Sequence, residues 1–147
     1  MLAVLLDYVT KWLAIEFLSD GDVYELFWTL QFRLVRNSGM AFSAGQNLGP
    51  LVGILVLFVV FFIFRIAIKV QNRIGLLAFG MLLGGAIGNL LDRIFRGSDG
   101  VLKGEVVDFV DFQWWPVFNV ADALIVVGGL LLVINGLENE RNKRDCS

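Results

Sequence analysis

Four long apolar stretches, separated by more polar connections, set the pattern of hydrophobic and polar positions along the chain. They cover about residues 1–18, 48–70, 74–93 and 117–137. A helix needs about 20 mostly apolar residues to cross the hydrocarbon of a bilayer, and about 17–25 are tolerated. The pattern therefore predicts an all-α membrane protein whose four transmembrane helices form a single integral membrane domain over residues 1–147.

The two long connections, about 23–47 and 94–116, carry patterns of their own. Leu30, Phe32 and Leu34 alternate with Gln31 and Arg33, which is a partial period-2 pattern typical of a strand. Aromatic residues gather in both connections, and Trp and Tyr favour the headgroup level of a membrane. We therefore expect a small β element within about 23–47 and an amphipathic segment within the loop 94–116, both on the outer face.

Basic residues favour one orientation in the membrane. They cluster in the short link between the second and third stretches and in the C-terminal tail: Arg65, Lys69, Arg73, Arg141, Lys143 and Arg144. Cytoplasmic loops carry an excess of Lys and Arg. Because an even number of spans puts both termini on one side, the sequence predicts that both are cytoplasmic.

Composition supports a membrane protein and excludes several kinds of chemistry. The chain is 57% hydrophobic and only 18% charged, and its net charge of −2 hides no strong block of either sign, so no nucleic-acid partner is expected. The single cysteine, Cys146, cannot form an internal disulfide and is expected to be a free thiol. Histidine is absent, which excludes Ser-His and Cys-His nucleophiles and HExxH zinc sites. Carboxylates remain as the leading candidates for acid–base chemistry.

Ionisable residues inside apolar stretches are costly and therefore point to function or to a specific structural need. Asp7 and Lys11 stand four residues apart in the first stretch, the spacing of a one-turn helical ion pair. They either support the helix beside a polar cluster or contact a substrate directly.

The third stretch combines small and polar residues. Gly80, Gly84 and Gly88 recur every fourth residue, which favours close packing of another helix or a bound chain. Asn89 and Arg93 follow one turn apart at the end of this stretch. They form either a shared polar site or, for the arginine, a side chain that reaches the membrane interface.

Carboxylates and one amide precede or open the fourth stretch. Asp108 and Asp111 lie in VVDFVDF, Asp122 lies eleven residues further on, and Asn119 suits the N-cap of a helix. Two carboxylates held close share a proton, so that one can activate water while the other protonates a leaving group. This is aspartic-protease chemistry and needs no metal, although such a pair can equally bind a cation or relay protons.

With these residues laid out, the chain resembles the bacterial lipoprotein signal peptidases, or signal peptidase II. The resemblance covers nearly the whole chain. It rests on five motifs in order: DYVTK (7–11), VRNSGMAFS (35–43), GGAIGNLLDR (84–93), VVDF (106–109) and FNVAD (118–122).

The resemblance implies roles for particular residues. Asp108 and Asp122 match the catalytic aspartates of the family, and Asp111 is the less favoured neighbour. The residues expected to shape the site or bind substrate are Asn37, Asn89, Arg93, Asn119, Asp7 and Lys11. No metal and no cofactor are implied.

The resemblance also implies a substrate and a location. Family members remove the signal peptide of diacylglyceryl-modified prolipoproteins just before the lipidated cysteine, at the outer leaflet of the bacterial inner membrane. Globomycin-like cyclic peptides inhibit them. We expect a multi-pass monomer in contact with membrane lipid. This chain has fewer residues before Asp7 than family members usually have.

Two other classes of function compete with this interpretation. One is a small proton- or ion-coupled membrane transporter subunit that uses Asp7, Asp108 and Asp122 as a relay, and the other is a non-catalytic assembly factor. Transport sites usually lie near the membrane midplane between repeats. Here the acids lie near the ends of the apolar stretches and the sequence shows no internal repeat, so the enzyme is favoured.

Overall fold

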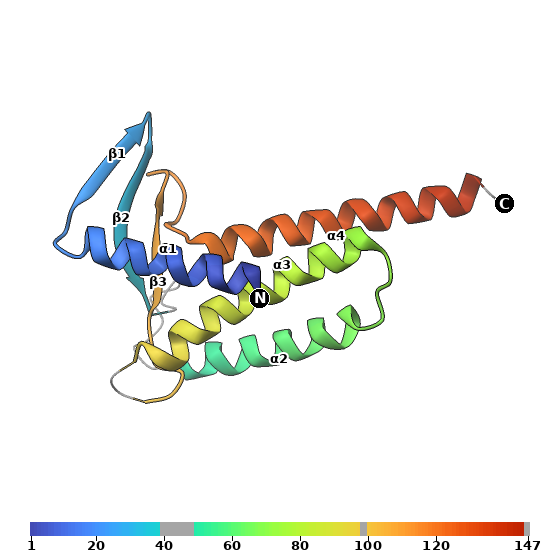
Figure 1. Cartoon of the computed structure of the whole chain (residues 1–147), viewed down its shortest axis with the longest axis horizontal. Helices are drawn as coiled ribbons and strands as arrows, with labels where there is room; N and C mark the ends of the chain where they lie inside the picture. Colours follow the sequence, from blue (N-terminus) through green and yellow to red (C-terminus); the bar gives the residue numbers. More distant parts are fainter. Residues whose placement is uncertain (39–48, 98–99, 146–147) are drawn as a thin grey trace.

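The computed structural model describes residues 1–38, 49–97 and 100–145. Within these ranges the helices are α1 (Leu2–Leu18), α2 (Gly49–Ala67), α3 (Arg73–Phe95) and α4 (Val120–Asp145), and the strands are β1 (Val23–Phe27), β2 (Leu30–Asn37) and β3 (Val106–Asp111). Figure 1 shows the sheet at one end of the helices, where α4 begins and α3 ends. The C-terminus lies at the opposite end of α4.

Among the described residues, three helices are long and apolar enough to cross a membrane: Pro50–Ala67, Arg73–Phe95 and Val120–Glu138. The second, third and fourth predicted stretches therefore correspond to helices of sufficient length. The first predicted stretch, which forms α1, does not meet the same criteria of length and composition. It has 17 residues, and these include the charged Asp7, Lys11 and Glu16. Asp7 and Lys11 are buried within the protein, so α1 contributes its polar residues to the interior.

Helix α3 lies among the other helices and packs against α1, α2 and α4 (Figure 1). Glycines of α3 allow α1 and α4 to approach closely. A Cβ atom at Gly88 would collide with the carboxylate of Asp7 on α1, and one at Gly85 would collide with the backbone carbonyl of Ala121 on α4. The predicted glycine stripe is therefore only partly a packing surface, because a Cβ atom at Gly80 would meet nothing within 4 Å.

The β element is larger than the sequence predicted. Strands β1, β2 and β3 form one antiparallel sheet in that order, with Val35 opposite Asp108 and Asn37 opposite Val106. The loop 94–116 contains β3, a strand that the sequence did not predict, and the amphipathic segment expected within this loop stays a prediction. All of β3 except Val110 is buried, so it lacks the alternating polarity of a half-exposed strand. The remainder of the β element expected at 23–47, residues 39–47, lies outside the described residues.

A small apolar core joins the sheet to α1. Ala14 and Leu18 of α1 pack with Val107 and Phe109 of β3, and Phe32 of β2 contacts this core from the side. The rings of Phe32 and Phe109 meet edge to face at 6.2 Å. Because β3 is fixed between β2 and α1, its polar residue Asp108 has a defined position.

Candidate active site

The start of α4 is held by a reciprocal pair of hydrogen bonds between Asn119 and Asp122. Asn119 Oδ1 accepts from the backbone N–H of Asp122 at 2.9 Å, and Asp122 Oδ2 accepts from the backbone N–H of Asn119 at 3.2 Å. This is the geometry of a capping box, which satisfies N–H groups that the first turn leaves without partners. The N-cap predicted at Asn119 is confirmed.

Asp108 faces this helix start from β3. Its Oδ1 accepts from Asn119 Nδ2 at 2.7 Å and its Oδ2 accepts from Asn37 Nδ2 at 2.9 Å. The residue is 2% exposed. The pKa of Asp108 is raised to about 6, chiefly by burial and also by the nearby Asp122, although the hydrogen bonds from Asn37 and Asn119 lower it.

Asn89 of α3 completes a connection between the two aspartates. Its Nδ2 donates to Asp122 Oδ1 at 2.8 Å, and its Oδ1 accepts from Asn119 Nδ2 at 3.1 Å. Two amide side chains therefore bridge Asp108 and Asp122. An amide has distinct donor and acceptor ends, so this chain of contacts fixes the orientation of both carboxylates.

On the other side of Asn89 lies the buried ammonium of Lys11. Lys11 Nζ donates to Asn89 Oδ1 at 2.8 Å and forms ion pairs with Asp7 Oδ2 at 2.8 Å and Asp92 Oδ2 at 2.9 Å. The ion pair predicted between Asp7 and Lys11 is confirmed. Asp92 also pairs with Arg96, with Nε and Oδ1 2.5 Å apart.

Arg93 lies beside this network and interacts electrostatically with Asp108, Asp122 and Asp92. The side chain is buried, and its Nη1 has no hydrogen-bond partner among the described residues. The alternative of an arginine that merely reaches the membrane interface does not fit this burial. Arg93 instead presents a charged donor inside the site.

Asp111 occupies a different environment. Its Oδ2 lies 2.5 Å from Arg33 Nε and accepts from Gln31 Nε2 at 2.8 Å, while its Oδ1 accepts from the backbone N–H of Gln113 at 2.6 Å. The hydrogen bond from Arg33 holds the pKa of Asp111 below its usual value. A carboxylate kept ionised in this way ties the end of β3 to β2 and does not share the proton of Asp108.

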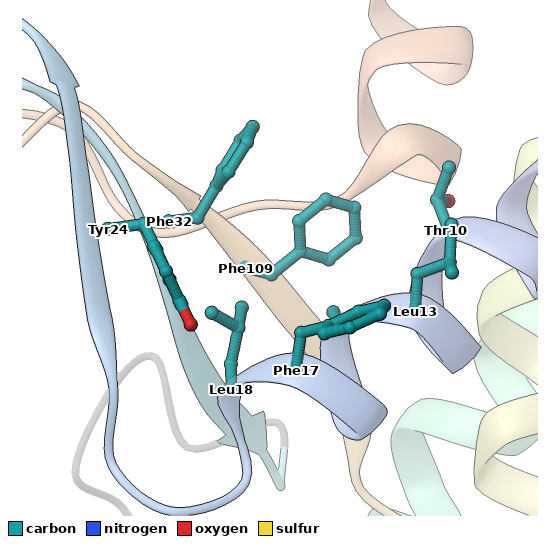
Figure 2. Close-up of a pocket in the computed structure, with 8 residues that line it drawn as sticks. Thr10, Leu13, Phe17, Leu18, Tyr24, Phe32 and Phe109 are labelled. Atoms are coloured by element: carbon teal, nitrogen blue, oxygen red, sulfur yellow. The ribbon is translucent and has the colours of Figure 1, made fainter.

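Two apolar cavities flank the sheet end of the network. One, of about 460 Å³, is lined by Asp122 and by apolar residues of α4 and the segment before it: Phe112, Trp114, Trp115, Phe118, Ala123, Val126 and Val127. The other, of about 440 Å³, lies between α1 and the sheet. Figure 2 shows Leu13, Phe17 and Leu18 of α1 on one side of it, with Phe109, Phe32 and Tyr24 from the strands opposite.

The structure thus brings together the residues that the sequence selected. Seven of the eight are connected by hydrogen bonds or ion pairs, namely Asp7, Lys11, Asn37, Asn89, Asp108, Asn119 and Asp122, and Arg93 lies alongside. Their catalytic and binding roles stay predictions. No group of three or more potential ligands placed to hold a metal ion occurs within residues 1–38, 49–97 and 100–145.

Sequence reasoning missed Asp92, which binds Lys11 as closely as Asp7 does. A signal was present, because Asp92 continues the four-residue spacing of Gly84 and Gly88 on the side of α3 that faces α1. The stripe predicted only the close approach of another helix or a bound chain, so the acid at its end was not selected.

Comparisons with known proteins agree with this arrangement. The family model for signal peptidase (SPase) II matches residues 1–138. Curated relatives include the lipoprotein signal peptidases of Mycobacterium leprae, 45% identical over 130 residues, and Rhodococcus jostii, 44% identical over 129 residues. These alignments cover 88% and 87% of this chain but 64% and 65% of the relatives, so the chain spans slightly less than two thirds of their length.

A solved structure described as a bacterial membrane enzyme, determined by the in meso method at 1.9 Å resolution, shares the fold with a TM-score of 0.79. It is 29% identical, and the match covers 92% of this chain and 88% of that one. A second structure with the same description at 2.3 Å resolution gives a TM-score of 0.70 at 29% identity over 97% of this chain and 87% of that one. Taken with the family model, which covers most of the chain, these likenesses show that the protein belongs to the signal peptidase II family.

Proposed function

We propose that this chain is an intramembrane aspartic endopeptidase that removes the signal peptide from diacylglyceryl-modified prolipoproteins, just before the lipidated cysteine. The observation that carries the proposal is the connection of Asp108 and Asp122 through the amides of Asn119 and Asn89. Membership of a peptidase family supports the reaction class. The name lipoprotein signal peptidase, given to relatives in Mycobacterium leprae and Rhodococcus jostii, supports the substrate class.

The two carboxyl groups have different roles in the proposed reaction. Burial favours the protonated form of Asp108, so we assign the acid role to Asp108 and the base role to Asp122, which is only half-buried and lines a cavity where water and substrate can enter. Asp122 takes a proton from water, whose oxygen attacks the scissile carbonyl, and Asp108 gives its proton to the carbonyl oxygen. As the tetrahedral intermediate collapses, the carbon–nitrogen bond breaks and the proton held by Asp122 passes to the leaving amine. Asp108 takes back a proton from one of the two hydroxyl groups, which leaves a carboxylic acid and restores the starting protonation of both aspartates.

The remaining predicted residues hold substrate and shape the site. The free Nη1 of Arg93 is a charged donor that can bind a backbone carbonyl of the substrate near the two aspartates. Asn37 fixes Asp108 from the sheet. The two apolar cavities suit a diacylated cysteine and the apolar part of a signal peptide, because each has the size and lining of a ligand pocket.

The location follows from the same arrangement. The sheet and the two aspartates lie at one end of the helices, and the C-terminus lies at the other (Figure 1). We place the sheet end toward the outer leaflet of the bacterial inner membrane and both termini on the cytoplasmic side, with the protein acting as a monomer. A globomycin-like peptide would bind across Asp108 and Asp122 and compete with substrate. The competing transporter hypothesis gains no support, because the acids gather at one end of the helices.

The proposal is tested by cleavage of a diacylglyceryl-modified prolipoprotein by the purified protein in lipid. Asp108→Asn and Asp122→Asn should each reduce turnover at least about 100-fold, since each removes one acid–base partner. Asp111→Asn is the matched control, because it makes the same chemical change on the same strand at a carboxylate held by Arg33, and it should keep most of the activity. A folded Asp108 or Asp122 variant with near-parent turnover would exclude the pair.

A further inference from the structure

The backbone just before each catalytic candidate is held by a buried carboxylate from another helix. Asp7 Oδ1 on α1 accepts from the backbone N–H of Ala121 at 2.9 Å, one residue before Asp122. Asp92 Oδ2 on α3 accepts from the backbone N–H of Val107 at 3.2 Å, one residue before Asp108. The two contacts are equivalent in kind, although one is made to a helix start and the other to a strand.

Lys11 joins these two carboxylates. Its Nζ lies 2.8 Å from Asp7 Oδ2 and 2.9 Å from Asp92 Oδ2, and its third hydrogen has an acceptor in Asn89 Oδ1 at 2.8 Å. An ammonium has three donors and no acceptor, so every donor of Lys11 is used. The side chain is 0% exposed. A buried ammonium with three fixed partners cannot move without losing charge-assisted hydrogen bonds.

Charge within this cluster is balanced. Asp7 and Asp92 contribute two negative charges, and Lys11 and Arg96 contribute two positive ones. The cluster therefore does not need the charge of Asp108 or Asp122 for its own stability. It contacts the catalytic pair through the neighbouring backbone amides, and Lys11 adds an electrostatic effect that lowers the pKa of Asp108.

We propose that Asp7, Lys11 and Asp92 form a spacer that sets the separation of the two catalytic aspartates by holding the backbone amides of Ala121 and Val107. This inference rests on the proposed function of Asp108 and Asp122. The three residues are positioning residues, because none of them donates to or accepts from either catalytic carboxylate in the hydrogen bonds described above. They hold β3 and the start of α4 at the separation that the two bridging amides, Asn89 and Asn119, require.

A change of length without a change of charge tests the spacer. Asp92→Glu keeps the carboxylate but displaces it by one methylene, so the ion pair with Lys11 and the hydrogen bond to Val107 cannot both keep their geometry. We expect kcat for the prolipoprotein to fall about 10- to 100-fold while KM stays within about twofold, because misplacement near 1 Å weakens chemistry more than binding. The pH profile of kcat should also become narrower. Carboxylates that move apart interact less, so the two apparent pKa values of the pair lie closer together.

Asp20→Glu is the matched control for this experiment. It makes the same change at an exposed residue after α1 and should leave kcat, KM and the pH profile at parent values. An Asp92→Glu protein with the parent kcat and pH profile would overturn the spacer. It would leave the proposed function intact if Asp108→Asn and Asp122→Asn are inactive in the same assay.

A thermal measurement tests the spacer without any reliance on catalysis. Asp7→Asn and Asp92→Asn each leave Lys11 one carboxylate, whereas the double variant leaves a buried ammonium with none. The loss of Tm in the double variant should exceed the sum of the single losses by about 3 °C or more, which reports coupling through Lys11. Additive losses would show that the three residues do not act as a unit and would overturn the inference, even if the protein cleaves its substrate as proposed.

Discussion

Asn119 serves α4 and Asp108 with opposite ends of one side chain. Its Oδ1 accepts the backbone N–H of Asp122 at 2.9 Å and so caps the helix, while its Nδ2 donates to Asp108 Oδ1 at 2.7 Å. The cap and the proposed catalytic pair are therefore linked by an amide of fixed orientation. Helix capping uses Oδ1 of Asn119 and the contact with Asp108 uses Nδ2, so a substitution can remove one of these roles and keep the other.

Asn119→Ser should preserve the helix and impair the reaction. A serine hydroxyl caps a helix about as well as an asparagine, so Tm should change by no more than about 2 °C. The shorter side chain cannot reach Asp108, and kcat should fall about 10- to 100-fold with KM nearly unchanged. Turnover and thermal unfolding of the same preparation check both parts. A large loss of Tm with unchanged kcat would assign Asn119 to capping alone.

Asp108→Asn should gain stability relative to the parent as the pH rises. The pKa of Asp108 is raised to about 6 from an ordinary value of 3.8, so the folded parent binds the proton more tightly than the unfolded chain. The parent therefore loses up to about 3 kcal/mol of stability between pH 4 and pH 7, and the asparagine variant does not. Unfolding of both proteins across this pH range checks the prediction. A difference in Tm that is independent of pH would contradict it.

Asp111→Asn should show the opposite trend. The hydrogen bond from Arg33 lowers the pKa of Asp111, so this carboxylate stabilises the fold above pH 4 and the contribution disappears as the pH falls through its folded-state pKa. The variant should be less stable than the parent at pH 7 and should approach it in acid. Measuring Asp108→Asn and Asp111→Asn together gives each an internal control, because two similar substitutions on one strand should produce opposite slopes.

Gly88→Ala should disrupt the site from the side of α3. The added methyl group would collide with the carboxylate of Asp7, which holds the start of α4 through Ala121. We expect a loss of about 1–3 kcal/mol in stability, as for overpacked cores, and a marked loss of activity. Gly80→Ala is the control on the same helix: it meets nothing within 4 Å and should be neutral or slightly stabilising, because alanine is the better helix former. Equal effects of the two substitutions would exclude a packing role for Gly88.

Local pattern predicted much of this molecule. Uninterrupted apolar runs identified α2, α3 and α4, since helix length and composition are properties of each segment alone. Helix α1 does not meet these criteria of length and composition. Asp7 and Lys11 interrupt its apolar run, and residues from α3 and α4 stabilise them. Whether such charges can be buried depends on partners far away in the sequence. The hydropathy of a short segment gives no information about those partners.

Strand β3 shows a second limit of local pattern. VVDFVD has no regular alternation because both faces of the strand are covered, by α1 on one side and by the polar network on the other. Its partner β2 lies about seventy residues earlier, and Asn37 reaches Asp108 only through that pairing. The candidate aspartates were found from their chemistry and motifs, whereas Asp92 was missed because its partners Lys11 and Val107 become visible only in three dimensions.

The hydrogen bond between Asp7 and Ala121 joins residues 114 positions apart, near the two ends of the chain. During synthesis Asp7 can therefore pair with Lys11 on its own helix long before the backbone N–H of Ala121, its partner in α4, has been made. The contacts between Lys11, Asn89 and Asp92 can form before α4 is made, whereas the contact between Asp7 and Ala121 can form only after α4 docks. A ribosome-bound or truncated chain that ends before Val120 should accordingly be inactive, because it lacks Asp122, and the proposed activity would depend on the docking of α4.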